Sequence, residues 1–337
     1  MKVLSDKSIE QYLKSLNYEG LKDFQVVLHT ALLEYKDDES IIPPRIVTKR
    51  GKATHIFMPL VGSQVGIKTL TGTTNGFKGA VTILDDIGNI RGILNATVLT
   101  AFRTALCSTL PLSRVFHSSG DRNLKGTKIL VFGVGLQAYW HIRLTLTMYP
   151  DQFVEVVVCN RTLSKAETFC ENLSKEFPDI KFNSLALDDE VAIEAACLNI
   201  SIIYGCLPST NPVILKRYVD NCQNGSLYIS VIGSYQPQMT EVDGLVIKEI
   251  LQGGGRIIVD SKEHASHEAG ELIQNMVPIG KLVEVSEYTS SEDISVYKGS
   301  SKIVLCKLVG LSIMDVAIGS KLIDDAEKRN DGISVDI

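Results

Sequence analysis

Hydrophobic residues after Lys128 fall into short β-branched runs that alternate with longer segments of helical spacing. Each run is almost continuously apolar, as expected for a parallel strand that helices cover on both faces. After the second run, apolar residues recur at three- and four-residue steps from Leu163 to Phe177, which indicates an amphipathic helix. Strands separated by helices predict an α/β fold with a doubly wound parallel sheet. The predicted strands are 128–132, 154–159, 180–185, 200–205, 227–232 and 256–260.

The chain before about residue 115 follows a different pattern, rich in strand-like segments that we expect to pair antiparallel. Ser5 or Asp6 can cap an N-terminal helix whose apolar face begins at Ile9. A helix over about 100–115 leads into the parallel sheet, and the chain closes with a strand-like run over 302–310 and a helical stretch over 311–329. The strand-like segments are 45–49, 53–60, 64–70, 79–86 and 90–96.

Length and composition fit a folded protein of two domains. The chain has 337 residues, 45% hydrophobic and 22% charged, which is typical of globular proteins and excludes extensive disorder. Lys and Arg total 34 against 39 Asp and Glu, for a formal net charge of -5. No overall positive field is therefore present to bind nucleic acid or an anionic membrane surface, and we expect neither partner.

The chain also lacks the marks of export. No apolar run approaches the roughly 18–20 residues that a membrane-spanning helix needs, and the N-terminus has no signal-peptide core. The seven cysteines include no CxxC pair, so we expect buried reduced thiols rather than a disulfide framework or a zinc site. These features predict a cytoplasmic protein.

The segment KILVFGVGLQA carries a glycine turn between a predicted strand and a predicted helix. Gly133 permits a tight turn, Gly135 lets the backbone approach a pyrophosphate, and the small Ala138 lets the helix pack on the strand. The intervening Leu136 and Gln137 would present their N–H groups to the phosphates. The strand, turn and helix together favour dinucleotide binding over a purely structural glycine turn.

The end of the second predicted strand bears on the choice of dinucleotide. NAD sites usually have Asp or Glu there for the ribose 2′-hydroxyl, whereas this strand ends in Asn160, Arg161 and Thr162. A guanidinium can pair with a 2′-phosphate through two hydrogen bonds, so Arg161 indicates NADP, with NAD still possible. The alternative is that Asn160 and Thr162 form a turn and helix cap and that Arg161 is merely solvated.

Three cations lie in predicted elements of the N-terminal segment. Arg103 borders an apolar stripe of its helix, and a partly desolvated guanidinium requires an anion. Lys68 lies on a predicted strand, and Arg45 follows two prolines that stiffen its approach. Each could instead be a surface charge or one half of a structural ion pair.

Several motifs in order resemble the ornithine cyclodeaminase and mu-crystallin family. They are FGVGLQA, LTAFRTALCS, MPLVGSQVGIKTLTG, IIVDSKEHASHEAGELI and CKLVGLSIMDVAIGSKL, spanning about Arg45 to Lys321. The resemblance implies a Rossmann-type NAD(P)-binding domain over 119–304. It also implies a second, strand-rich α+β domain for substrate binding and dimerisation over 1–118 with 305–330, and a homodimer. The last residues lack a helical stripe, so we expect a tail over 331–337.

The resemblance further assigns roles to residues. It implies that Arg45, Lys68 and Arg103 bind the carboxylate of the substrate, and it makes Asp315 a candidate pocket residue. A carboxylate that interacts with the dipole of the last helix is the alternative for Asp315. The positions that it implies for cofactor binding are Thr104, Cys206 and Leu207.

One departure from the family pattern concerns the reaction. Ornithine cyclodeaminases carry an aspartate directly after the glycine that ends the fifth strand, whereas this chain has Ser234 there. A neutral hydroxyl cannot act as that carboxylate does, so Ser234 and the segment NRT are more similar to the mu-crystallin branch, whose relatives reduce ketimines with NADPH. Asn95, Cys206 and the segment LVEV over 282–285 are further departures.

These observations predict an NAD(P)H-dependent oxidoreductase that reduces a small cyclic imino acid to an amino acid. Two alternatives stay open: an ornithine cyclodeaminase that releases ammonia and forms proline, and a non-catalytic protein that binds NADPH and a carboxylate ligand. We expect no metal, since His264 and His267 lack an apparent third ligand, and no hydrolase, since no GxSxG turn follows a strand.

Overall fold

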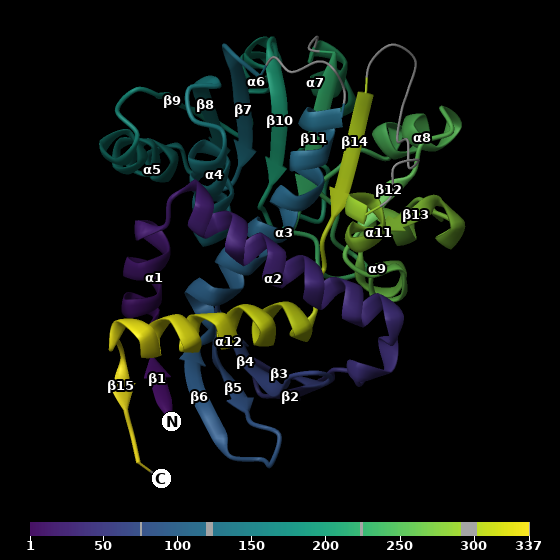
Figure 1. Cartoon of the computed structure of the whole chain (residues 1–337). Helices are drawn as coiled ribbons and strands as arrows, with labels where there is room; N and C mark the ends of the chain where they lie inside the picture. The colour runs from purple at the N-terminus through teal and green to yellow at the C-terminus, as the bar shows by residue number, and fades with distance from the viewer. Residues whose placement is uncertain (75, 119–123, 223–224, 291–301, 337) are drawn as a thin grey trace. The chain divides into compact units, whose positions relative to one another are not determined.

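The computed structural model describes residues 1–74, 76–118, 124–222, 225–290 and 302–336 (Figure 1). The chain divides into two compact units, one of residues 1–107 with 310–337 and one of residues 108–309. The sequence places these boundaries at 118 and 305. The first boundary lies inside one helix, α3 (Ala96–Ser118), whose continuous apolar pattern contains no linker signal.

The unit of residues 108–309 is built on a sheet of eight parallel strands in the order β13-β12-β14-β11-β10-β7-β8-β9. Every residue of β10 and β11 is buried, as continuous apolar runs require. The order reverses between β7 and β10, so the predicted Rossmann-type doubly wound sheet is confirmed. The strands are β7 (Thr127–Phe132), β8 (Phe153–Asn160), β9 (Lys181–Ala186), β10 (Ile200–Gly205), β11 (Ser226–Val231), β12 (Ile257–Val259), β13 (Leu282–Glu284) and β14 (Lys302–Lys307).

Two of these strands are not among the six predicted for this sheet: β13, and β14, which corresponds to the strand-like run predicted over 302–310. β14 pairs in parallel with β11, where Leu305 lies opposite Ile229 and Lys307 opposite Val231. The prediction that 305–307 belong to the other domain is therefore wrong. The run IVLC is apolar on both faces and is buried in the sheet, next to β11 and β12 in Figure 1.

Helices connect the strands of this unit. The predicted stripe of α5 buries Ala166, Cys170 and Leu173. The glycine run after α8 ends that helix, because Gly253 is its C-cap. The helices are α4 (Leu136–Met148), α5 (Leu163–Glu176), α6 (Glu190–Ala196), α7 (Lys216–Asn221), α8 (Gly244–Gln252), α9 (Lys262–Glu268), α10 (Gly270–Gln274) and α11 (Val285–Ser290), with a 3-10 turn η2 (Ile279–Lys281).

The other unit is built on a seven-stranded sheet in the order β15-β1-β6-β5-β4-β3-β2. The predicted antiparallel pairing holds from β2 to β6, and β1 adds in parallel to β6. The strands are β1 (Lys2–Leu4), β2 (Ile46–Arg50), β3 (Ala53–Val61), β4 (Val65–Thr73), β5 (Gly76–Leu84), β6 (Ile90–Asn95) and β15 (Ile333–Ser334).

Helices α1 (Asp6–Ser15), α2 (Tyr18–Asp37) and α12 (Ser312–Arg329) belong to this unit, with a 3-10 turn η1 (Glu39–Ile41). Ser5 is the N-cap of α1, as predicted, and accepts the N–H of Ser8. The helix α12 is buried over most of its length, so it forms the core of this unit with the sheet. No helix in the part of the chain that the structure describes is long and apolar enough to cross a membrane.

The predicted tail over 331–337 includes ordered strand structure. β15 pairs antiparallel with β1, and the N–H of Val335 donates to the carbonyl of Met1 at 3.0 Å. The segment has no helical stripe, but the free edge of β1 supplies backbone partners that a sequence pattern does not reveal. Residue 337 lies outside the described residues.

Candidate functional site

The glycine turn lies between β7 and α4. Gly133 has a φ of +117°, and a Cβ atom there would lie 2.9 Å from the carbonyl oxygen of Cys206, so only glycine fits. Gly135 is the N-cap of α4 and has open space around its Cβ position. Ala138 is fully buried, as helix packing on the strand requires.

The turn also has the electrostatics of an anion site. The N–H groups of Leu136, Gln137 and Ala138 stand in the first turn of α4, where they have no acceptor within the helix. The helix dipole makes this end positive. The turn lies at the carboxyl end of β7, next to the point where the strand order reverses, which is where open α/β sheets bind ligands. These residues fit a dinucleotide pyrophosphate.

The residues at the end of β8 were predicted either to bind a 2′-phosphate through Arg161 or to form a turn and helix cap, and the structure has features of both. The amide nitrogen of Asn160 donates to the carbonyl of Thr162 at 3.0 Å, so Asn160 holds the turn. Arg161 is exposed. Thr162 is the N-cap of α5 but makes no side-chain cap hydrogen bond. Arg161 is thus available to a phosphate, and the choice of NADP stays a prediction.

The structure brings the predicted cations together around Asp315. The ammonium of Lys68 on β4 lies 2.9 Å from Oδ1 of Asp315, and Nε of Arg103 on α3 lies 3.2 Å from the same oxygen. All three side chains are almost completely buried. Asp315 stands in the first turn of α12, and its Oδ2 atom is buried with no hydrogen-bond partner. We call Arg45, Lys68, Arg103 and Asp315 the cation cluster.

Arg45 joins this cluster through Gly310. Its guanidinium donates to the carbonyl of Gly310 at 3.1 Å, and a Cβ atom at Gly310 would lie 2.8 Å from a guanidinium nitrogen of Arg103. Lys68 and Arg103, both buried, therefore share one carboxylate, which leaves positive charge for an anionic ligand. The pKa of Lys68 is lowered to about 8, chiefly by burial; Asp315 opposes this shift, and Arg103 and Arg45 contribute to it.

The other positions predicted to bind cofactor have local roles. The hydroxyl of Thr104 donates to the carbonyl of Thr100 at 2.8 Å within α3. Cys206 and Leu207 follow β10, and the N–H of Cys206 donates to the carbonyl of Phe132 at 2.9 Å. Burial raises the pKa of the Cys206 thiol well above its usual value, so this thiol is not a nucleophile at neutral pH.

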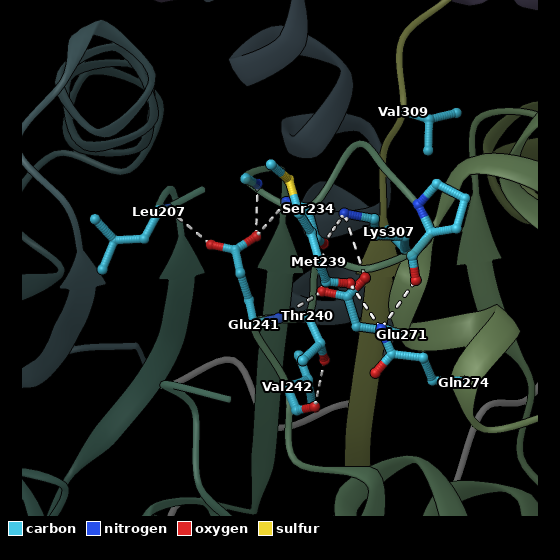
Figure 2. A network of polar contacts seen from close by, with 12 residues as sticks. Leu207, Ser234, Met239, Thr240, Glu241, Val242, Glu271, Gln274, Lys307 and Val309 are labelled. Atoms are coloured by element: carbon cyan, nitrogen blue, oxygen red, sulfur yellow. Dashed lines mark hydrogen bonds and ion pairs between the residues drawn. The ribbon is translucent and has the colours of Figure 1, made fainter. Parts of the chain in front are cut away.

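Ser234 lies in a buried network after β11 (Figure 2). Its hydroxyl donates to Oε1 of Glu271 on α10 and accepts from the ammonium of Lys307 at 2.5 Å. Lys307 lies 3.6 Å from Oε2 of Glu271. Glu241 completes the network, because its N–H donates to Oε1 of Glu271 at 2.8 Å. Ser234 is thus held between a cation and a carboxylate.

Glu241, Glu271 and Lys307 were not predicted from the sequence. Lys307 carried a usable signal, since a lysine inside the apolar run IVLCKLVG must be buried and must have an acidic partner. His264 and His267 lie on α9. Within the described ranges, no three His, Cys, Asp or Glu side chains come together to hold a metal ion.

Comparison with curated proteins finds relatives along nearly the whole chain. An uncharacterized protein of Saccharomyces cerevisiae is 29% identical over 98% of this chain and 98% of its own. An uncharacterized cyclodeaminase of Dictyostelium discoideum is 27% identical over 82% of this chain and 80% of its own. Delta(1)-pyrroline-2-carboxylate reductase 2 of Burkholderia ambifaria is 24% identical over 93% of this chain and 95% of its own. No family model matches the chain.

Solved structures share the fold. Delta(1)-pyrroline-2-carboxylate reductase of Thermococcus litoralis, in complex with NADH and L-proline, has a TM-score of 0.80 at 18% identity and covers 99% of this chain and 100% of its own. An archaeal alanine dehydrogenase dimer with bound NAD has a TM-score of 0.78 at 16% identity and covers 100% and 99%. The relatives and the fold confirm the predicted resemblance to the ornithine cyclodeaminase and mu-crystallin family.

Proposed function

We propose that this protein is an NAD(P)H-dependent oxidoreductase that reduces a small cyclic imino acid to an amino acid. The cation cluster carries this proposal, because its two buried cations, Lys68 and Arg103, share the single carboxylate of Asp315, and a site for a small carboxylate requires such an excess of positive charge. The glycine turn of the other unit fits the cofactor. The reductases among the relatives and structures described above agree with this substrate class.

The division of labour follows from the residues. When bound, a reduced nicotinamide would supply the hydride that adds to the carbon of the protonated imine, and the π electrons of the C=N bond would pass to the nitrogen to give the neutral amine. Arg103 and Arg45 pair with the substrate carboxylate through charge-assisted hydrogen bonds, and Lys68 adds a third positive charge. These contacts orient the imine, so the chain contributes to the rate mainly by positioning.

The test is turnover by the purified protein. Delta(1)-pyrroline-2-carboxylate or Delta(1)-piperideine-2-carboxylate is mixed with NADPH or NADH, and cofactor absorbance and amino-acid product are followed together. Arg103→Gln should lower kcat/KM by about 10- to 100-fold, the loss expected for one charged hydrogen bond. Arg91→Gln is the control, because Arg91 pairs with Asp324 in a half-exposed ion pair outside the cation cluster.

The same assay separates the alternatives. Proline formed from ornithine with NAD, without ketimine turnover, would identify an ornithine cyclodeaminase. Tight NADPH binding without turnover of ketimines, amino acids or diamines would identify a non-catalytic binding protein. Ser234 argues against the first alternative, since its hydroxyl already lies between Lys307 and Glu271.

The depressed pKa of Lys68 gives a pH prediction. Lys68 loses its proton as pH rises through about 8, and the cation cluster then has one charge less for the carboxylate. We expect kcat/KM to fall above about pH 8, because this ratio reports groups of the free enzyme. In Lys68→Met, kcat/KM should be low at every pH and lack this step. A step at the same pH in Lys68→Met would assign the titration to another group.

We further propose that the preferred cofactor is NADPH and that Arg161 selects it. Arg161→Ala should raise the KM for NADPH by about 10- to 100-fold, the equivalent of one charge-assisted pair, and leave that for NADH unchanged. Lys165→Ala is the matched control, because Lys165 is an exposed cation on the adjoining helix α5. Equal effects of Arg161→Ala on the KM values for NADPH and NADH would show that Arg161 does not contact the 2′-phosphate.

We also infer that the protein forms a homodimer. Ile46 on the edge strand β2 lies opposite Phe57 on β3, and these side chains are 58% and 37% exposed. Val47 is 53% exposed, so this end of the sheet presents apolar surface that a second copy would cover. Sedimentation should show a dimer, and Ile46→Lys should shift it towards monomer.

A further inference from the structure

Glu241 is a buried carboxylate that accepts three backbone N–H groups from two loops. Its Oε1 accepts from Leu207 at 2.8 Å, in the loop after β10. Its Oε2 accepts from Gly233 at 2.5 Å and Ser234 at 3.2 Å, in the loop after β11. Figure 2 shows the carboxylate between Leu207 and Ser234, so one side chain joins the ends of two neighbouring strands.

The two loops are in close contact at Gly233. A Cβ atom at Gly233 would lie 2.0 Å from the carbonyl oxygen of Leu207 and 2.7 Å from Oε1 of Glu241. The backbone of one loop therefore contacts that of the other, and the carboxylate fills the space beside them. Glu241 comes from a third segment, just before α8, and Val242 bridges to Ile214.

Charged neighbours make this carboxylate sensitive to protons. Burial opposes its ionised form, as does Glu271 on α10, whereas Lys307 on β14 and the N–H groups of Leu207 and Gly233 favour it. The Cys206 thiol also faces Glu241 and is neutral. Burial is the largest effect and raises the pKa of Glu241 to about 7.

The place of these loops in the sheet relates them to one part of a dinucleotide. In a sheet of this topology the adenine ribose lies at the end of the second strand, here β8, and the pyrophosphate at the glycine turn after β7. In the strand order β8-β7-β10-β11, the nicotinamide half of the dinucleotide then lies at the ends of β10 and β11. These are the two strands whose loops Glu241 joins.

We propose that Glu241 is a positioning residue, whose ionised carboxylate holds the loops after β10 and β11 in the geometry that receives the nicotinamide half of the cofactor. This inference rests on the proposed dinucleotide binding and on no assumption about the substrate. It assigns Glu241 no contact with the reacting atoms. Protonation would turn one acceptor oxygen into a donor that faces N–H groups, and the loops would lose that geometry.

The experiment compares a whole cofactor with its adenine half. Binding of NADPH and of 2′,5′-ADP is measured by calorimetry on the full chain and on Glu241→Gln, whose amide nitrogen cannot accept an N–H. We expect NADPH affinity to fall by at least about tenfold, since one buried N–H loses its acceptor, and 2′,5′-ADP affinity to stay within about twofold. If the wild type prefers NADH, the pair is NADH and ADP. Glu263→Gln, an exposed carboxylate of the same unit, is the control.

The pH dependence of cofactor affinity is a second test, and because it is measured on the wild type it does not depend on whether a variant folds. In the wild type, the ratio of NADPH to 2′,5′-ADP affinity should fall below about pH 7, as Glu241 takes up its proton. Both ligands carry the 2′-phosphate, so the ratio cancels its titration, and the same ratio in Glu241→Gln corrects for the 5′-phosphate of 2′,5′-ADP, which is a monoester and titrates near pH 6. Glu271→Gln keeps an oxygen acceptor for Ser234 and for the N–H of Glu241 but removes a like charge, so the midpoint should move to lower pH.

The outcomes separate this inference from the proposed function. Wild-type protein that binds no dinucleotide would overturn both. Wild-type binding with equal losses of NADPH and 2′,5′-ADP in Glu241→Gln, with no selective loss of NADPH, would overturn the positioning role alone. An unchanged midpoint in Glu271→Gln would also overturn it. A selective loss of NADPH and a shifted midpoint would support it.

Discussion

Replacing Asp315 with alanine is expected to lower the free energy of unfolding by about 3–5 kcal/mol, because it leaves two buried cations without their shared anion. Lys68 and Arg103 are 1% and 4% exposed, and both pair with Oδ1 of Asp315. Urea unfolding followed by circular dichroism measures the change. The loss should be smaller at pH 9 than at pH 7, since Lys68 can release its proton and Arg103 cannot.

Two further variants test this explanation. Lys68→Met in the Asp315→Ala background should recover part of the stability, because it removes one of the uncompensated charges. Asp324→Ala breaks an ion pair with Arg91 whose side chains are 35% and 47% exposed, and it should cost only about 0–1 kcal/mol. Equal losses for Asp315→Ala and Asp324→Ala would show that the cation cluster is not a desolvated network.

Alanine at two nearby glycines is expected to separate folding from cofactor binding. Gly133→Ala puts a Cβ atom 2.9 Å from a backbone oxygen at a φ of +117°, so we expect a loss of about 2–5 kcal/mol in the free energy of unfolding. Gly135→Ala meets no atom within 4 Å, so the fold should keep its stability. Its methyl group would stand where the backbone must approach a pyrophosphate, so NADPH affinity should fall by about tenfold or more.

Thermal unfolding and NADPH titration of both variants measure these effects. The informative comparison is Gly135→Ala, in which stability and affinity should change independently. Normal NADPH affinity in a fully folded Gly135→Ala protein would place the phosphates elsewhere than at this turn. A stable Gly133→Ala protein would show that the turn can shift away from Cys206.

The parts of the fold that the sequence predicts are those with a local physical signature. The glycine turn at Gly133 is such a case, because strand, turn and helix are contiguous and each has its own pattern. The buried runs of β10 and β11 are another. Within the cation cluster, the sequence predicts that Arg103 has an anionic partner, because a guanidinium beside an apolar stripe needs an anion.

Other features depend on contacts between distant residues and have no local signature. Glu241 and Lys307 are 66 positions apart, and nothing in either segment names the other as partner. The same holds for β15, whose strand conformation depends on pairing with the opposite end of the chain at β1. The division at 107 falls inside a regular helix, where periodicity is uninterrupted. Such features can be recognised only in the folded structure.

The contacts of Gly310 with Arg45 and Arg103 connect anion binding to the backbone conformation at this residue. It is the first residue after the 108–309 unit and has a φ of +91°; its carbonyl accepts from Arg45, and its missing side chain makes room for Arg103. An anion that draws the guanidinium of Arg45 towards itself competes with this carbonyl, and an anion that draws Arg103 alters the packing against Gly310. We therefore expect occupancy of the carboxylate site to change the backbone torsions of Gly310.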